Sequence, residues 1–170
     1  IHVLLDDFER TAALCQESIE VSIQAGDIMC ELISYGLQAW AQCMQDNVDP
    51  GFHFQRVAET IEEFLERNIS VPTNFSVSIA IASMVLSYRL VDEKEKRKRY
   101  AAWVKKTFSV VKGRCRMNNL ETALFLAAQG GWKLLHGKPS AGKKLLIKAI
   151  QWAKQHHQVP QLIMVYQFIE

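Results

Sequence analysis

The sequence predicts an all-α fold of about seven to eight antiparallel helices, stacked in pairs as an α-solenoid. Apolar residues recur at helical spacing along most of the chain, as expected for amphipathic helices. No segment of useful length combines the alternating pattern and the turn residues of a β-strand. Helix pairs are expected to begin near Ile28, Asn74 and Leu120, about every 46 residues, which is typical of a repeat architecture.

A strong local signal separates the first two expected helices. We expect one helix over Leu4–Ala25 and a second over Ile28–Met44. Between them, Gly26 suits a helix C-terminus and Asp27 suits the N-cap of the next helix. Gly36 lies inside the second helix, where a glycine costs about 1 kcal/mol relative to alanine. Its presence indicates that another helix approaches closely there.

The middle of the chain carries an acidic helix and then a helix without charge. We expect the third helix over Phe52–Arg67 and the fourth over Asn74–Leu90. The uncharged run Ile69–Tyr88 contains Pro72 and several serines and threonines, so it is too polar to span a membrane. A helix that is buried on most sides explains this run.

Caps and breakers place the fifth and sixth helices. Asp92 can cap a fifth helix, which begins with a very polar stretch and is expected to stop at Gly113. Asn118 or Asn119 can cap the sixth helix, and Gly137 is expected to end it. Two more helices then follow, one after the Pro-Ser pair at 139–140 and one over 162–169, separated by the Val-Pro pair at 159–160.

The segment Gly137–Lys144 satisfies the phosphate-loop pattern GxxxxGK through Lys143. That loop needs a strand before it and a Ser or Thr hydroxyl after the lysine, whereas here a helix precedes and Lys144 follows. We therefore interpret the segment as a helix–turn–helix with solvated lysines. The adjacent His156 and His157 point about 100 degrees apart on a helix and make a poor metal pair. We expect no metal, cofactor or catalytic residue in this chain.

Small residues recur between Leu126 and Ala149, at Gly130, Gly137, Gly142 and Ala149, and Leu146 supplies a bulky residue. This placement resembles a tetratricopeptide repeat, in which small residues let the two helices of one repeat cross closely. The chain departs from that motif at Leu126, Lys133 and Lys154, where the repeat usually has Trp, Tyr and Pro. The expected period of about 46 residues also exceeds the 34 of tetratricopeptide repeats and lies near that of HEAT-type repeats.

The long helices, the Gly26-Asp27 junction and the ending AIQWAKQHHQVPQL are similar to helical-repeat regions that follow ATPase modules in large signalling proteins. Soluble adenylyl cyclase-type proteins are one example of that group. The resemblance implies a regulatory or scaffolding segment, and it carries over no catalytic residue. Because the chain opens with Ile1 directly in a periodic apolar pattern, we expect residues 1–170 to be a single helical-repeat block cut from a longer protein.

Cysteines and tryptophans are both expected inside the protein. The four cysteines have no paired spacing and lie in apolar helical patterns: Cys15, Cys30, Cys43 and Cys115. We expect free thiols that pack as small hydrophobic groups, which fits a reducing, cytoplasmic compartment. The four tryptophans are expected in the core or between repeats, with one or two in a groove: Trp40, Trp103, Trp132 and Trp152.

Charge divides the chain into an acidic and a basic part. Residues 1–68 carry 13 acids and 3 bases, whereas residues 69–170 carry 17 bases and 5 acids. The two expected helices with the densest charge form a candidate partner surface: Glu59, Glu62, Glu63, Glu66, Lys94, Lys96, Arg97, Lys98, Arg99, Lys105 and Lys106. Such an asymmetry governs association rather than fold. The acidic and basic helices could face each other within the molecule, or they could present opposite charges at opposite ends of the block. We favour the second arrangement, which predicts head-to-tail self-association at low salt.

The sequence favours a non-catalytic function. Solenoids bind along a surface and need no catalytic residues, so we expect a protein–protein interaction module or a regulatory scaffold of a larger signalling protein. Its ligand would be a protein partner or neighbouring domains of the same chain. One alternative is the regulatory tail of a soluble adenylyl cyclase-type or other nucleotide-dependent enzyme. Another is nucleic-acid binding through the basic half, although no RNA- or DNA-binding motif accompanies it.

Overall fold

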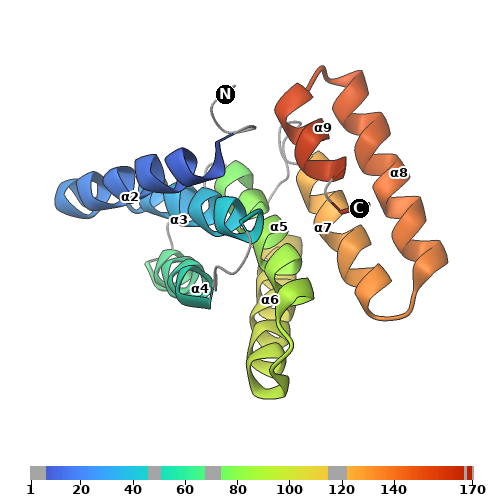
Figure 1. The fold of residues 1–170 in the computed structure, drawn as a ribbon, viewed down its shortest axis with the longest axis horizontal. Coiled ribbons are helices and arrows are strands. Elements are labelled where there is room, and N and C mark those ends of the chain that lie inside the picture. Colours follow the sequence, from blue (N-terminus) through green and yellow to red (C-terminus); the bar gives the residue numbers. More distant parts are fainter. Residues whose placement is uncertain (1–6, 46–50, 68–73, 115–121, 167, 170) are drawn as a thin grey trace. The chain divides into compact units, whose positions relative to one another are not determined.

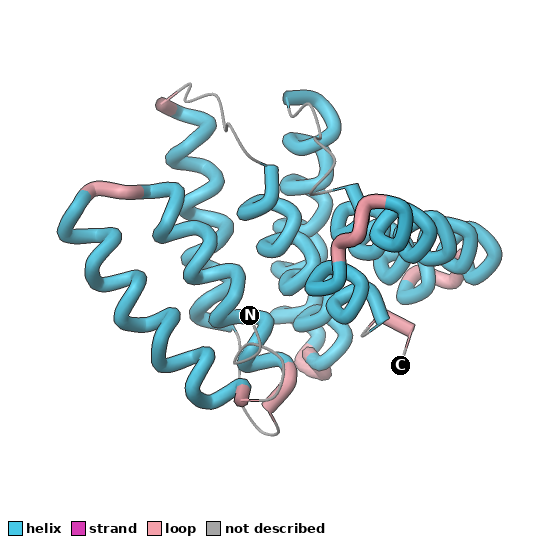
Figure 2. Tube along the Cα trace, turned by 90° about the horizontal axis from the view of Figure 1, so that it is seen from above, coloured by secondary structure: helices cyan, strands magenta, loops and turns pink. Residues whose placement is uncertain are grey.

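The structure is a computed structural model that describes residues 7–45, 51–67, 74–114, 122–166 and 168–169. Eight α-helices account for nearly all of this described part, and short turns join several of them (Figure 2). The predicted all-α class is therefore confirmed, whereas the solenoid arrangement stays a prediction. The chain divides into two compact units, Ile1–Cys115 and Arg116–Glu170, and each unit has its own packing.

The first unit contains five of these helices. They are α2 (Phe8–Ala25), α3 (Ile28–Cys43), α4 (Gly51–Glu66), α5 (Asn74–Leu90) and α6 (Lys94–Arg114). Helices α2 and α3 lie side by side as an antiparallel hairpin (Figure 1). Helix α3 also packs on α4 and α5, and α5 packs on α6. Helix α4 in turn contacts α6, although α5 separates them in the chain.

The described part of the second unit contains three helices that follow one another through short turns. They are α7 (Thr122–Leu135), α8 (Pro139–Gln155) and α9 (Val159–Tyr166). Helices α7 and α8 form a long antiparallel pair, and the short α9 packs against both (Figure 1).

Most of the described side chains of helix α5 are buried. Every side chain from Ile81 to Tyr88 is buried, as predicted for this part of the uncharged run. The Ser83 hydroxyl lies 2.7 Å from the carbonyl oxygen of Gly36 and 2.9 Å from that of Ile79. This contact brings the backbone of α3 against α5 at Gly36, as the interior glycine predicted.

Within the described residues, one kind of turn joins helices at three places: Gly26–Asp27, Gly137–Lys138 and His157–Gln158. The first residue of each turn is left-handed, with φ of 67°, 69° and 54° respectively. The amide of the second residue donates a hydrogen bond to a carbonyl of the preceding helix. The acceptors are the carbonyls of Ser22, Lys133 and Ala153, at 2.9, 2.9 and 2.8 Å respectively. The carbonyl of that second residue then accepts the first hydrogen bond of the next helix. A Schellman ending therefore runs directly into an N-cap, as predicted at Gly26–Asp27 and Gly137.

Glycines let α7 and α8 cross closely. A Cβ on Gly142 would lie 2.9 Å from the carbonyl oxygen of Gly130, and a Cβ on Gly130 would lie 3.1 Å from that of Gly142. A Cβ at Gly142 would push against the backbone of α7, and a Cβ at Gly130 would displace the side chain of Leu146. Ala149 and Leu146 are buried in the same helix pair. Gly130, Gly142, Leu146 and Ala149 thus have the packing roles that their spacing predicted, whereas Gly137 serves the turn and has no close neighbour.

Some predicted helix boundaries are wrong. The first helix begins at Phe8 rather than Leu4, because the Asp7 carboxylate accepts the amide of Arg10 at 2.9 Å and caps the helix. The amide of Arg97 bonds to the carbonyl of Glu93, so the N-cap of α6 is Glu93 and not Asp92.

Two breakers also act differently from the prediction. Helix α6 continues through Gly113 to Arg114. The Val159-Pro160 pair begins α9 instead of separating two helices, because a proline in the first turn removes an amide that has no helical partner. The predicted caps Asn118 and Asn119 lie outside the described residues.

The burial predicted for the cysteines and tryptophans is only partly correct. Cys15 is buried, and burial raises the pKa of its thiol to about 11, whereas Cys30 is exposed in the first turn of α3. The side chains of Cys43 and Cys115 lie outside the described residues. Trp40 is fully buried, but the other three tryptophans are half-buried. The rings of Trp132 and Trp152 pack against the imidazoles of His136 and His156, with centroids 4.0 and 4.5 Å apart.

Replacing Ala149 with Leu tests the packing of α7 on α8. Ala149 is 0% exposed, so three extra carbons would overpack the helix pair, and we expect a loss of about 1–3 kcal/mol in the free energy of unfolding. Urea denaturation followed by circular dichroism measures this loss. Lys148→Leu is the matched control, because it introduces the same side chain at the adjacent exposed position. An equal urea midpoint for both variants would contradict the packing.

His157→Gly tests the left-handed turn before α9. A residue with a Cβ is strained at φ 54°, and glycine removes that strain at the cost of more freedom in the unfolded chain. We expect a net gain of about 0.5–1 kcal/mol in unfolding free energy, measured by the same denaturation experiment. The reverse change at the equivalent turn, Gly137→His, should lower stability. A loss of stability in His157→Gly would show that the imidazole makes a contact that outweighs the strain.

Candidate functional site

A cleft of about 290 Å³ opens between α4 and α6 and is lined by Gln55, Ala58, Glu59, Glu62, Arg99 and Trp103. We call it the α4–α6 cleft. Its α4 residues are spaced three or four apart, as are its α6 residues, so each set lies on one face of its helix. The cleft therefore has an acidic wall and a wall that combines a guanidinium with an indole.

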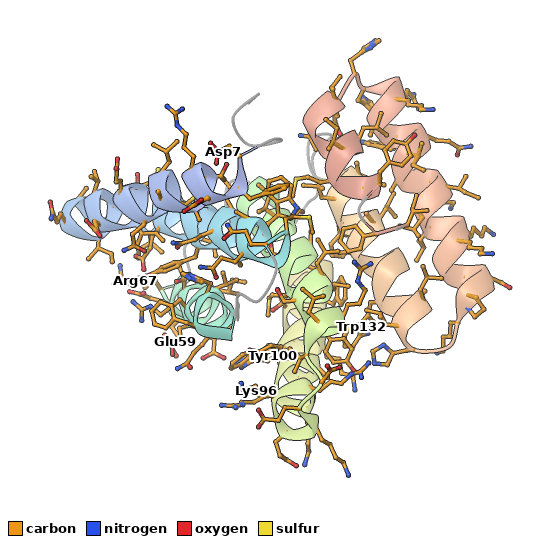
Figure 3. The ribbon with its side chains drawn as sticks, viewed as in Figure 1. Asp7, Glu59, Arg67, Lys96, Tyr100 and Trp132 are labelled. Carbon is orange, nitrogen blue, oxygen red and sulfur yellow. The ribbon has the colours of Figure 1, made fainter. Side chains whose placement is uncertain are left out.

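Hydrogen bonds orient the acidic wall. One carboxylate oxygen of Glu59 accepts a bond from the Gln55 amide at 2.8 Å. The other oxygen of Glu59 accepts a bond from the Arg56 guanidinium at 3.0 Å. Glu59, labelled on α4 in Figure 3, is thus held between two donors one turn away. The carboxylate keeps further lone pairs for a ligand, because each oxygen can accept more than one hydrogen bond.

Arg56 connects this wall to α3. Its Nε donates to the Tyr35 hydroxyl at 3.3 Å, and its guanidinium carbon lies 5.6 Å from the centre of the Tyr35 ring. The Tyr35 bond, followed by the contact with Glu59, raises the pKa of Arg56, so the side chain stays charged. Glu31 on α3 is near the same arginine, and partial burial raises the pKa of its carboxyl despite that attraction. The position of Glu59 therefore depends on α3 as well as α4.

The wall formed by α6 is built on an aromatic stack. The ring of Trp103 lies on that of Tyr100, with centroids 5.5 Å apart and planes 20° apart. Tyr100, labelled in Figure 3, is buried, so it gives the half-buried indole a fixed support. Arg99 stands one turn away and is exposed. Among the described side chains, none forms an ion pair with Arg99.

The two walls are joined by an ion pair. Lys106 of α6 donates to the Glu62 carboxylate of α4, across 44 residues of sequence. Both side chains are about half exposed, so the pair contributes no more than about 1 kcal/mol to stability. Its main effect is geometric, because it connects one end of the cleft from helix to helix.

The structure brings together only part of the predicted partner surface. Glu59, Glu62 and Arg99 line the cleft, and Lys106 pairs across it. Other members have local partners: Glu63 pairs with Arg67, Lys96 pairs with Glu93, and Arg97 lies 5.0 Å from the ring of Tyr88. Four members are exposed outside the cleft: Glu66, Lys94, Lys98 and Lys105.

The sequence prediction missed Gln55 and Ala58 and did not connect Trp103 with the charges. Their helical spacing in the sequence could have identified all three. Gln55, Ala58 and Glu62 follow each other at helical intervals, as do Arg99, Trp103 and Lys106. The two faces were visible in the sequence, but the contact between them was not.

The GxxxxGK segment lies in the second unit, at the turn between α7 and α8. Gly137 is the left-handed residue of that turn, and residues 139–144 already belong to α8. Lys143 and Lys144 are exposed. The interpretation of this segment as a helix–turn–helix is therefore confirmed, and the expected absence of a nucleotide stays a prediction.

In the part of the chain that the structure describes, no three His, Cys, Asp or Glu side chains gather as metal ligands do. None of the helices described there is both long and apolar enough to cross a membrane. Comparison of this chain with protein-family models, with curated proteins and with solved structures found no match.

His53 lies on α4 one turn before the cleft residues and is buried. Its ring centroid is 5.2 Å from that of Phe52 and 6.3 Å from that of Tyr35. Its Nδ1 has no hydrogen-bond partner among the described residues. Burial disfavours the charged imidazolium and lowers the pKa of His53.

We expect His53 to make the first unit less stable in mild acid. Below a pH of about 6.5 the unfolded chain binds a proton at this residue that the folded chain resists, so stability falls as pH decreases from there towards the folded pKa. Urea midpoints at about pH 7.5 and about pH 5.5 measure the fall. His53→Phe should reduce it. An unchanged pH dependence in that variant would assign the effect to other groups.

Proposed function

We propose that this segment is a non-catalytic protein-interaction module, a scaffold or regulatory part of a larger signalling protein, and that the α4–α6 cleft receives a peptide segment of its partner. The partner is another protein or a neighbouring domain of the same chain. The observation that carries the proposal is the composition of the cleft: a guanidinium and a supported indole opposite two oriented carboxylates.

The size of the cleft favours a side chain of a polypeptide over a cofactor. Sites for small molecules usually enclose about 300–1,000 Å³ and bury most of the ligand. The α4–α6 cleft has about 290 Å³ and is open to solvent. One or two side chains of a peptide that lies across α4 and α6 would fill it.

The chemistry of the two walls defines the peptide. Arg99 has a planar guanidinium that can bind a carboxylate through two hydrogen bonds. Trp103 beside it offers a flat apolar surface of the kind that dominates binding energy at interfaces. The peptide therefore carries an acidic residue next to an apolar one. Glu59 and Glu62 on the opposite wall accept hydrogen bonds from its backbone amides or from a basic residue.

A phage-displayed peptide library tests the proposal, because it samples the short motifs that a partner could present. We expect selection on the wild-type chain to enrich an acidic–apolar motif. In calorimetry with the selected peptide, Arg99→Glu and Trp103→Ala should each weaken binding at least about tenfold, equivalent to 1.4 kcal/mol. Lys98→Glu is the matched control, because it makes the same charge change on the neighbouring residue outside the cleft, and its affinity should stay within about twofold.

Two results would contradict the proposal. One is a library that yields no motif, and the other is a selected peptide that binds both cleft variants as tightly as it binds the wild-type chain. Anisotropy with labelled single-stranded RNA separates the nucleic-acid alternative. Binding through phosphate contacts would fall steeply with salt and would depend on the lysines rather than on Trp103.

A further inference from the structure

The described part of the second unit carries basic but no acidic side chains. Residues 122–169 contain six lysines and three histidines but no aspartate, glutamate or arginine. Four of the lysines lie on α8 and are exposed: Lys143, Lys144, Lys148 and Lys154. No side chain within residues 122–169 can neutralise them, so this surface attracts acidic groups from elsewhere.

The lysines of α8 form one face around an exposed apolar residue. The opposite side of the helix is buried through Gly142, Leu146, Ala149 and Ala153. The outer face comprises the four lysines, two glutamines and Ile147, whose side chain is 55% exposed. Figure 3 shows nitrogen-tipped side chains standing along this helix. We call this set the basic face of α8.

Helix α2 presents the complementary surface. Its buried side is formed by Thr11, Cys15, Ile19 and Ser22. On the outer side, Glu9, Glu17 and Glu20 are exposed, and Arg10 is the only base in the helix. Leu14 and Val21 are 48% and 64% exposed, two turns apart. We call the three glutamates with Leu14 and Val21 the acidic face of α2.

We propose that these two faces are a self-association site, in which the acidic face of α2 of one copy docks on the basic face of α8 of a second copy. This inference is independent of the α4–α6 cleft, because it uses none of its residues. The two helices have nearly equal lengths, 18 and 17 residues. Leu14 and Val21 are about 10 Å apart along the helix axis, so Ile147 fits between them.

The same geometry pairs the charges. On α8, the lysines at 143, 144 and 148 lie within one turn of Ile147. On α2, Glu17 and Glu20 lie within one turn of Leu14 or Val21. Docking Ile147 between Leu14 and Val21 therefore brings the lysines near these glutamates. Apolar contact in the centre and opposite charges at the sides are how coiled-coil helices select their partners.

A second copy fits the basic face better than a nucleic acid does. All the cations of α8 are lysines, whereas arginine is preferred where phosphate is bound through two hydrogen bonds. The central Ile147 would also be left against a charged backbone, where it gains nothing. The acidic face of α2 supplies carboxylates that can pair with the lysines of α8 and apolar residues that can cover Ile147.

Sedimentation velocity of the whole chain measures the association. We expect a concentration-dependent oligomer at about 50 mM NaCl that dissociates by about 500 mM, because salt screens exposed charges. A monomer at both salt concentrations overturns the proposal, including a monomer that binds single-stranded DNA or anionic vesicles instead. An oligomer that is insensitive to salt also overturns it.

Two charge-reversal variants then test which faces meet. The first carries Glu9→Lys, Glu17→Lys and Glu20→Lys, and the second carries Lys143→Glu, Lys144→Glu and Lys148→Glu. Each variant alone has two faces of the same sign and should be a monomer. An equal mixture restores opposite signs between copies and should regain the oligomer. Because misfolded chains would not recover on mixing, this rescue separates docking from loss of structure.

A third variant controls for charge alone. Lys94→Glu, Lys98→Glu and Lys105→Glu change three exposed lysines of α6, and the oligomer should keep its affinity within about threefold. Loss of the oligomer in this control, or no recovery in the mixture, overturns the assignment of the two faces. Arg99→Glu and Trp103→Ala should leave self-association unchanged, so failure of the cleft proposal and failure of this one are distinguishable.

Discussion

The first unit depends on the burial of α5. A helix that is covered by protein along Ile81–Tyr88 cannot carry charge, because an unpaired buried charge costs several kcal/mol. Ser83 on this helix donates its hydroxyl to the backbone of α3. Helices α3 and α6 both pack on α5, and α4 contacts all three. The α4–α6 cleft therefore exists where it does because two helices that are distant in sequence use the same buried helix as their support.

Helix ends were predictable where the chemistry is local. Gly26 and Gly137 lie at left-handed positions that glycine tolerates, and the residue after each begins the next helix. Errors arose where two local signals competed. At the first helix, periodicity extends past Asp7, but the capping bond of that residue decides the boundary. Gly113 lies inside α6 because a glycine only weakens a helix and does not end it without a C-terminal hydrogen-bond motif.

The charged residues of the site could be predicted from the sequence, but the contact between the two helices that brings them together could not. Glu59, Glu62 and Arg99 belonged to the predicted partner surface, since exposed charges on amphipathic helices can be recognised by spacing. The pairing of α4 with α6 is non-local, and no periodicity along one helix specifies which face of a later helix it meets. The support of Trp103 by Tyr100 was hidden for a related reason: an aromatic pair four or fewer residues apart is typical of both a core and a groove.

The Asp27 cap has a chemical consequence for the thiol beside it. An exposed cysteine in the first turn of a helix ordinarily has a lowered pKa and forms the nucleophilic thiolate. Here the hydrogen bond between Cys30 and the Asp27 carboxylate, with some burial, raises the pKa of the thiol. The carboxylate that fixes the start of α3 thus also disfavours the thiolate of the neighbouring cysteine. Cys30 is exposed at the start of α3, yet the residue that caps this helix favours the less nucleophilic thiol form.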